Sequence, residues 1–461
     1  MIEEKYLPKD VSITQQDWDN TPESIRVLIL SLIRRIEGLE AKLNQNSSNS
    51  NKPPSSDAPF NKPKPKTGAK KKKGKPGGRK GHKGYRQVLH NPTNVQEVHP
   101  QQCSCGCSRF KDQHPYYTHQ HIELPPIQME ITHFILYQGK CSECGEINKG
   151  YAPKEFTAGY GPRFSALIVE LAGIAGNSRD MVKSFCDSVL GVPISLGAIQ
   201  KVIDRASNAI TPHYETIKDT ARSHDINHVD ETSWKNGGDL HWLWVMANTM
   251  VVFFMIHANR SKEAFNQLID MWNGILISDD YGLYRKWVGL RQTCLAHLIR
   301  TAKGLSERKN PELAACGKWA RKELQRLCKM ANAPPTRGEW NAFFARLCRL
   351  IAFYKDSESE AGKFVRRIEK EMDNLFVFLS ENGVDPTNNY AERMLRFGVI
   401  WRKRSYGSNS DKGCRWVERI LSVRHTCRLH KKSTFDIIAD AMDCYFKEQK
   451  PDVSWLKAMP A

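Results

Sequence analysis

The segment from residue 226 to 280 constrains the fold of this chain more than any other part. It contains three short apolar stretches separated by polar turns, at 226–230, 240–248 and 251–257. The second stretch, LHWLWVMAN, alternates in the way typical of a half-buried strand, so the three predict an antiparallel meander. A helix is predicted at 261–272 because Ser261 can cap it and Glu263 lies in its first turn. A fourth strand is predicted at 274–280.

Two of these predicted strands end in carboxylates. Asp230 closes the first strand and Asp279 closes the fourth. Three meander strands, a helix and a further strand form the beginning of a ribonuclease-H-like mixed sheet, in which the first and fourth strands lie side by side. We therefore expect the two aspartates to be neighbours. Two like charges held close need a cation, and carboxylate oxygens suit Mg²⁺ or Mn²⁺ in two-metal phosphoryl chemistry.

The best third carboxylate lies far along the chain, in the segment DPTNNYAERMLRFGVIWRKRSYGS. Asn388, Glu392 and Arg396 recur at helical spacing and share one face. An alternative interpretation is a capping box formed by Asn389 and Glu392. A site that holds DNA also needs cations for phosphates, and this favours a catalytic role for Glu392. The nearby cations predicted to bind DNA are Arg393, Arg396, Arg402, Lys403 and Arg404.

Two further features near the predicted site have structural interpretations. Adjacent residues on a strand point to opposite faces, so Glu231 is expected to be a structural neighbour of Asp230. Cys294 and His297 have half of a zinc-site spacing but no second half nearby in the sequence. We expect them, with Asn388 and Asn389, to support the site, and a metal role for the Cys294 and His297 pair is the alternative.

The charge distribution predicts a polyanionic partner. The chain has a net charge of +19, and the run from Lys62 to Gly84 contains eleven Lys or Arg residues and no acid. Its Gly, Pro and Lys content predicts a disordered linker, and its lysines can bind phosphates without sequence preference. Arg79, Lys80 and Lys83 are the predicted DNA contacts, since this Gly-rich core is thin enough for a minor groove. DNA is favoured over RNA or an acidic lipid surface.

The N-terminal part predicts a helix that could dimerise. Apolar residues alternate at spacings of four and three, the a/d pattern of a coiled coil, at Ile25, Ile29, Leu32, Ile36, Leu39 and Leu43. Because this pattern covers less than three heptads, packing against the rest of the chain is a nearly equal alternative. A polar linker, 44–57, is expected to end the helix.

Clustered cysteines predict a small zinc-binding module. CSCGC at Cys103 to Cys107 and CSECG at Cys141 to Gly145 resemble two knuckles joined by a segment with strand character. Two thiolate pairs on such turns can hold one tetrahedral Zn²⁺. Cys103, Cys105, Cys141 and Cys144 are the preferred ligands, Cys107 can replace either of the first two, and reduced structural thiols are the alternative.

At 461 residues the chain is long enough for several domains. The predicted fold class is a mixed α/β, multidomain protein. The expected segments are an N-terminal helix or coiled coil (1–46), a disordered basic linker (47–95), a zinc-binding module (96–155), a helical module (156–222), a catalytic domain (223–445) and a C-terminal tail (446–461). The apolar run VLILSLI is too short to span a bilayer and the start lacks signal-peptide features, so a cytoplasmic protein is expected.

The motifs HVDETSW, HWLWV, SDDYGLY, CLAHLIR, NNYAERMLR and WRKRSYGS resemble, in order and spacing, the DDE transposases of bacterial insertion sequences, specifically the insertion sequence sixty-six family. The resemblance extends upstream through NSSNSNKPPSSD, KPGGRKGHKG and the knuckles to nearly the whole chain. It implies a ribonuclease-H-like domain with the triad Asp230, Asp279 and Glu392, Mg²⁺ as cofactor and terminal inverted repeats as substrate. It also implies a helical insertion at about 298–381 and a nucleoid location.

Two departures from the family pattern bear on the site. Asp280 stands where glycine is common, and an extra carboxylate there could perturb metal affinity. Arg79 and Lys80 stand where the family tends to have Gln and Pro. A homodimer or higher oligomer and accessory proteins of the element are expected partners. The alternatives are a DNA-binding or architectural protein without catalysis, and a nuclease on the same fold.

Overall fold

The computed structural model describes residues 13–50, 52, 57 and 88–459. The chain divides into two compact units, one formed by 1–59 with 133–461 and the other by 60–132. The predicted DNA contacts Arg79, Lys80 and Lys83 lie outside the described residues.

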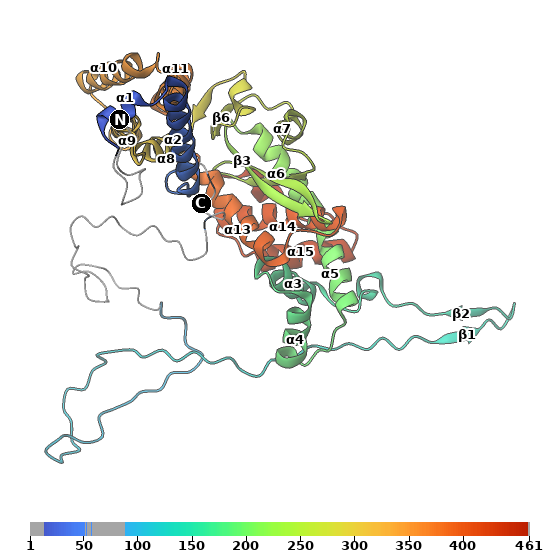
Figure 1. The fold of residues 1–461 in the computed structure, drawn as a ribbon. Helices are drawn as coiled ribbons and strands as arrows, with labels where there is room; N and C mark the ends of the chain where they lie inside the picture. The colour runs from blue at the N-terminus through green and yellow to red at the C-terminus, as the bar shows by residue number, and fades with distance from the viewer. Residues whose placement is uncertain (1–12, 51, 53–56, 58–87, 460–461) are drawn as a thin grey trace. The chain divides into compact units, whose positions relative to one another are not determined.

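A five-stranded mixed sheet, whose strands β3 and β6 are labelled in Figure 1, forms the centre of the larger unit. Its strand order is β5-β4-β3-β6-β7. The antiparallel meander consists of β3 (Ile226–Asn236), β4 (Asp239–Ala247) and β5 (Val252–His257). After helix α7 (Lys262–Ile269), β6 (Ile275–Ser278) pairs in parallel with β3, and β7 (Arg291–Thr293) pairs in parallel with β6. The predicted meander, helix and side-by-side first and fourth strands are therefore confirmed.

The sheet differs from the prediction in two respects. The first strand does not end at Asp230 but continues to Asn236, where a turn at Gly237 and Gly238, with φ of +60° and +97°, leads into β4. The polar residues of this extension stay in register with β4. They form a strand because they pair with β4, although their low apolar content did not predict one. The fifth strand, β7, was not predicted, because three residues are too few to show a period.

Helices cover the sheet on the side that carries Asp230. On β3 and β4, Thr232 lies opposite Leu243, and directly opposed residues point to the same face. Helix α13 (Asn389–Ser405) packs on this face so closely that a Cβ on Gly398 would lie 2.6 Å from Leu243 Cδ2. Asp230 is two residues from Thr232 and therefore shares the face that α13 covers.

Helix α14 (Asp411–Leu429) protects the exposed edge of the sheet. The outer strand β5 has no further strand beside it, and three of its backbone N–H groups donate to side chains of α14. Val252 donates to Thr426 Oγ1 at 3.1 Å, Phe254 to Ser422 Oγ at 2.9 Å, and Ile256 to Glu418 Oε1. These acceptors recur every four residues, so one helix face satisfies an edge that would otherwise pair with another chain.

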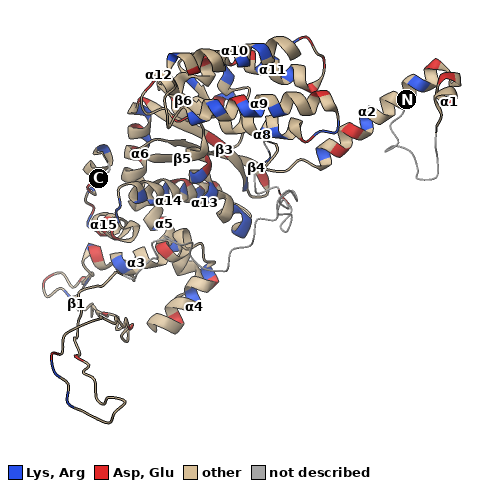
Figure 2. Cartoon of the chain, turned by 90° about the vertical axis from the view of Figure 1, so that its left-hand side faces the viewer, with Lys and Arg blue, Asp and Glu red and all other residues tan. Residues whose placement is uncertain are grey.

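A helical insertion follows β7 and precedes α13, close to the predicted 298–381. Its elements are α8 (Leu295–Ser306), α9 (Pro311–Lys329), α10 (Arg337–Tyr354), α11 (Glu360–Lys370), η6 (Met372–Leu375) and α12 (Val377–Ser380). Figure 2 shows α8 to α11 gathered beside the sheet. Their apolar core includes Ile277 of β6, so the insertion and the sheet share one hydrophobic cluster.

The helices before the sheet pack onto the end of the chain. They are α3 (Pro162–Val169), the π-helical η4 (Glu170–Ile174), α4 (Arg179–Leu190), α5 (Leu196–Ala209) and α6 (Thr211–Ser223). Helices α3 and α5 contact α15 (Thr434–Phe446), while α6 contacts both α14 and β5. The predicted helical module is therefore helical, and its packing continues across the predicted boundary at residue 222.

The N-terminal region contains α1 (Gln15–Asn20) and α2 (Glu23–Leu43), and most of the predicted heptad residues of α2 are exposed. The polar segment after α2, predicted as a linker, forms a hydrogen-bonded turn. Ser48 donates to Asn46 Oδ1 and Asn49 donates to Glu307 Oε2 at 2.9 Å. A Cβ on Gly304 of α8 would lie 2.2 Å from the Asn49 carbonyl oxygen, so this turn docks closely on the insertion.

The predicted strand character between the two cysteine clusters is largely wrong for the described residues. Only Gln138–Lys140 forms a strand, β1, which pairs with β2 (Ile147–Lys149) around the second cluster. The rest of the segment has exposed apolar side chains and no partner strand. No helix within the described ranges is long and apolar enough to cross a membrane.

Replacing Glu418 with Gln should change how stability depends on pH. Burial raises the pKa of this carboxyl from 4.5 to about 7, so ionisation above the unfolded-state pKa favours unfolding. The wild type should lose about 3 kcal/mol of unfolding free energy, relative to Glu418→Gln, as pH rises from about 4.5 to 7. Urea unfolding of both proteins from pH 4.5 to 8 measures this difference, and parallel pH curves would contradict it.

Candidate active site

The pairing of β3 with β6 places Asp230 and Asp279 at equivalent positions on neighbouring chain segments. His228 lies beside Ile277 in the parallel register, and each aspartate is two residues beyond that pair. Both side chains therefore point to the same face of the sheet, at the point where β6 ends and β3 continues. Both residues are half-buried. The sequence correctly predicted that they are neighbours, although Asp230 lies within its strand and not at its end.

The electrostatics of this pair are unfavourable without a cation. Burial raises the pKa of Asp230 well above its usual range, and the nearby carboxylates of Glu231, Asp279 and Glu392 raise it further. Burial also raises the pKa of Asp279, against a hydrogen bond from the backbone N–H of Tyr281. No ion pair to Asp230 is present within the described residues. A site of this kind favours a bound cation.

Glu392 lies in the first turn of α13, on the helix that covers the Asp230 face. Its Oε1 atom accepts from Arg300 Nη2 at 2.9 Å and lies 3.5 Å from His297 Nε2, and both partners are on α8. The capping-box alternative is wrong, because Asn388 and not Asn389 is the N-cap and no side-chain cap bond forms. Asn389 is the first residue of the helix.

Asn388 fixes the start of the glutamate-bearing helix against the sheet. It is fully buried, and its Nδ2 donates to the Val229 carbonyl at 2.9 Å. Its Oδ1 lies 3.1 Å from His228 Nδ1, and its backbone N–H donates to Cys294 Sγ at 3.1 Å. Asn388 therefore joins β3, the start of α8 and α13 at the residue before Asp230.

Cys294 and His297 lie where support for the site was predicted. Burial raises the pKa of Cys294 to about 12, so this thiol stays protonated. Burial, with nearby Arg300 and Arg367, lowers the pKa of His297 to about 3, so its ring is neutral. Neither residue belongs to a described group of three or more possible metal ligands.

Comparison with known protein families identifies the class of protein. A family model described as the transposase IS66 family matches residues 182–415, more than half of the chain. The chain belongs to this family. A model for a family of unknown function matches residues 7–88 of the same IS66-family transposase. No curated protein matches it.

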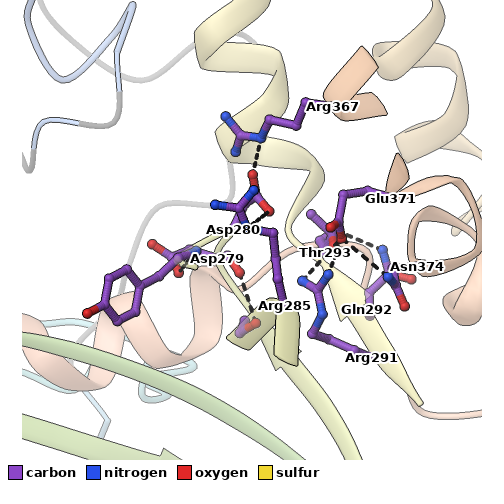
Figure 3. Close-up of polar contacts among 11 residues, drawn as sticks. Asp279, Asp280, Arg285, Arg291, Gln292, Thr293, Arg367, Glu371 and Asn374 are labelled. Atoms are coloured by element: carbon purple, nitrogen blue, oxygen red, sulfur yellow. Dashed lines mark hydrogen bonds and ion pairs between the residues drawn. The ribbon is translucent and has the colours of Figure 1, made fainter. Parts of the chain in front are cut away.

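In this IS66-family transposase, the unusual Asp280 is neutralised by arginines. Its side chain is 2% exposed and is paired with Arg367 of α11 and with Arg285, whose Nε lies 3.6 Å away. Figure 3 shows Asp280 between these two guanidinium groups, next to a second buried pair formed by Arg291 and Glu371. Asp280 is therefore paired with arginines, but its charge still contributes to the raised pKa of Asp279. Its effect on metal affinity stays a prediction.

Glu231 has a structural environment on the opposite face from Asp230. It is paired with Arg260 and accepts from the Tyr284 hydroxyl, and its side chain is 1% exposed. Arg260 in turn lies 3.8 Å from the centre of the Tyr281 ring. The sequence did not predict roles for Arg260, Arg300 and Arg367. Only Arg300 could have been found from the sequence, because it follows the predicted support residue His297 by three positions and so lies on the same helix face.

The predicted DNA-binding cations of α13 divide into two groups. Arg393, Arg396, Lys403 and Arg404 are exposed, and Figure 2 shows the Lys and Arg positions along this helix. Arg402 instead turns into the protein, where Nη1 donates to Ser233 Oγ at 2.5 Å and to Thr232 Oγ1 at 3.3 Å. We therefore find Arg402 engaged with β3, while the other four are exposed, although Arg404 Nη1 also donates to the Ala175 carbonyl at 3.2 Å.

The residues predicted to bind metals do not form a complete metal-binding group. Across the described part of the chain, no three His, Cys, Asp or Glu side chains come together in a way that could hold a metal ion. At the carboxylate site the charges and donor types fit a divalent cation, but Glu392 is engaged by Arg300.

Each cysteine cluster, taken by itself, forms a tight hydrogen-bonded backbone turn. Gly145 donates to the Cys141 carbonyl at 3.0 Å, and backbone N–H groups of Cys144 and Glu143 lower the pKa of Cys141 to about 7. Gly106 donates to the Cys103 carbonyl at 2.8 Å, and a backbone hydrogen bond from Cys105 lowers the pKa of Cys103. Cys107 Sγ accepts from the Arg109 N–H at 3.4 Å.

Replacing Asn388 with Ala should destabilise the protein and loosen the start of α13. The change removes the Asn388 partner of the Val229 carbonyl and of His228 Nδ1, while His228 Nε2 keeps its contact with Asp385. Each unsatisfied buried group costs about 1–3 kcal/mol. Urea unfolding should show this loss, while Asn409→Ala, at an exposed position, should leave stability within about 0.5 kcal/mol. Equal stability of the two variants would show that the Asn388 contacts carry no net free energy.

Proposed function

We propose that this protein is a DDE transposase that cuts DNA at the ends of an insertion sequence and joins those ends to target DNA. The observation that carries the proposal is the level placement of Asp230 and Asp279, two half-buried carboxylates with raised pKa values on the face covered by the helix of Glu392. We assign these three residues as the catalytic carboxylates. Membership of the IS66 transposase family supports the reaction class.

The proposed catalytic fold is ribonuclease-H-like. The strand order β5-β4-β3-β6-β7, with β4 antiparallel to its neighbours and β6 and β7 parallel to β3, supports this proposal. We place the catalytic domain at 223–445, with the insertion within it, and keep the zinc-binding module at 96–155 and the helical module at 156–222 as proposed divisions.

The proposed reaction consists of two in-line displacements at phosphorus. Water attacks a phosphodiester at the element end, the bond to the 3′-oxygen breaks, and a free 3′-hydroxyl remains. That hydroxyl then attacks a target phosphodiester, and a new DNA strand joint replaces the old one. Mg²⁺ or Mn²⁺ held by the carboxylates would supply Lewis-acid charge stabilisation for both displacements. The protein's own contribution is to fix the carboxylates and to position the DNA.

We propose that the DNA backbone crosses the exposed cations of α13. Arg393 and Arg396 are one and four residues beyond Glu392, and Lys403 and Arg404 continue along the same helix. Guanidinium and ammonium groups at this spacing suit phosphates and carry no sequence information. Arg79, Lys80 and Lys83 would add sequence-independent affinity, in agreement with the net charge of +19. This DNA substrate implies a nucleoid-associated, cytoplasmic enzyme.

We also propose oligomerisation through α2. Five of its six a/d residues are exposed, from 44% for Ile25 to 84% for Leu43, and Ile29 is half-buried. Such a stripe is typical of a coiled-coil seam. A dimer would bring two active sites to the two ends of one element. Accessory proteins of the element could bind the same assembly.

Removing one catalytic carboxylate should abolish chemistry but leave DNA binding intact. Asp230→Asn, Asp279→Asn and Glu392→Gln should each lower cleavage of a duplex carrying the element end by about 10³-fold or more. Band-shift affinity for the same duplex should change little. The matched control is Asp239→Asn, at an exposed position of β4, which should cleave normally.

Three outcomes separate the candidate functions. Unchanged cleavage in the carboxylate variants would contradict the assigned site, and absence of cleavage in the wild type would favour an architectural DNA-binding protein. A precleaved element end that joins to a plasmid identifies a transposase, whereas cleavage without joining identifies a nuclease.

The two knuckles are proposed to bind one structural Zn²⁺ through Cys103, Cys105, Cys141 and Cys144, with Cys107 as the alternative. The lowered pKa values of Cys103 and Cys141 support this, because thiolates are the zinc ligands. Metal analysis of the purified protein should find about one zinc per chain. The Cys141→Ser variant should lose this zinc. The control variant Cys348→Ser, which removes an exposed cysteine outside both clusters, should keep it. Zinc retained in Cys141→Ser would contradict the assignment.

A further inference from the structure

The strongest unexplained contact at the proposed site joins Glu392 to Arg300. The guanidinium donates from Nη2 to Glu392 Oε1 at 2.9 Å, and the same oxygen lies 3.5 Å from His297. Asp230, in contrast, has no ion pair within the described residues. The positive charge near this site is therefore the guanidinium of Arg300, and it is paired with Glu392 and not with the aspartates. It binds a carboxylate oxygen that Glu392 would need as a metal ligand.

We propose that Arg300 has two successive partners, the Glu392 carboxylate before metal binding and a DNA phosphate after it. This inference rests on the proposed function, since it takes Glu392 as a ligand. One carboxylate oxygen cannot keep a short guanidinium contact and also approach a divalent cation at about 2.1 Å. The ion pair must open when metal binds, and Glu392 then turns toward Asp230 and Asp279.

The surroundings of Arg300 are suited to such an exchange. Its side chain is 24% exposed and that of Glu392 is 32% exposed, so the pair is within reach of solvent and of a bound DNA strand. The Nε atom of Arg300 is buried and has no hydrogen-bond partner. A guanidinium presents five donors in a planar fork, and Arg300 uses one of them on Glu392, so a phosphate could satisfy donors that the carboxylate leaves free.

The position of Arg300 on α8 links this exchange to the rest of the insertion. Arg300 follows His297 by three residues, on a helix whose first residue, Leu295, donates to the Pro386 carbonyl at 3.0 Å, close to the start of α13. The two residues of the ion pair therefore lie on helices joined near their starts by a backbone hydrogen bond, and we expect the pair to open by side-chain rotation. Arg300 would act as a positioning residue for Glu392 and as a phosphate-binding residue for DNA.

The two roles predict changes of opposite sign in one variant. Arg300→Gln removes the competitor of the metal, so Mn²⁺ should bind the DNA-free protein more tightly, by about fivefold for a partly exposed ion pair. The same variant lacks the phosphate contact, so single-turnover cleavage of the element-end duplex at saturating Mn²⁺ should slow by about tenfold or more. A purely structural role for Arg300 would weaken both.

The experiment compares full-length wild type, Arg300→Gln, Asp230→Asn and Arg349→Gln. Arg349 is an exposed residue of α10 and controls for the loss of one positive charge. Calorimetry with Mn²⁺ alone gives the affinity, single-turnover cleavage gives the rate, and thermal unfolding checks each fold. Arg349→Gln should match the wild type in both assays.

Failure of this inference is distinguishable from failure of the proposed site. Mn²⁺ affinity that is unchanged or weaker in Arg300→Gln, or an unchanged cleavage rate, overturns the two-partner role while Asp230→Asn still loses metal. Wild-type Mn²⁺ affinity in Asp230→Asn overturns the carboxylate site itself. If Arg300→Gln does not fold, Arg300→Lys, which keeps the charge but lacks the planar fork, should show smaller changes in the same two directions; no change in either would overturn the proposal.

Discussion

The structure depends on the parallel pairing of β3 with β6, because this pairing sets two carboxylates side by side. His228 and Ile277 are register partners, and from there the backbone alone carries Asp230 and Asp279 to the same level. The electrostatic cost of this arrangement is visible in the raised pKa values of both residues. Burial of the large apolar sheet around the pair supplies that free energy on folding.

Polar side chains that bind sheet backbone hold the surrounding helices in place. Helix α14 uses Glu418, Ser422 and Thr426 to satisfy the outer strand. On the central strand β3, Asn388 binds the Val229 carbonyl and so fixes α13 one residue before Asp230. Hydrogen bonds of this kind are directional, so they set the position of a helix more narrowly than apolar packing does.

The helical insertion contributes residues to the candidate site. It shares a hydrophobic cluster with β6, and two of its arginines reach carboxylates beside the aspartate pair. Arg367 of α11 neutralises Asp280, and Arg300 of α8 holds Glu392. The insertion therefore determines which partner Glu392 has in this structure. Helix α8, which carries Arg300, also contacts the polar turn that follows α2.

The sequence by itself determined the elements with strong local signals. Alternation and turns predicted the meander, Ser261 predicted the following helix, and the motifs predicted the family. It could not show that β3 continues through Thr232 to Asn236, because those polar residues form a strand only by pairing with β4. The tertiary structure alone decided that Arg402 faces β3, that Asp280 is neutralised and that Glu392 is bound by Arg300. Each of these depends on which residues meet across more than 80 positions of chain, and local propensity carries no information about such partners.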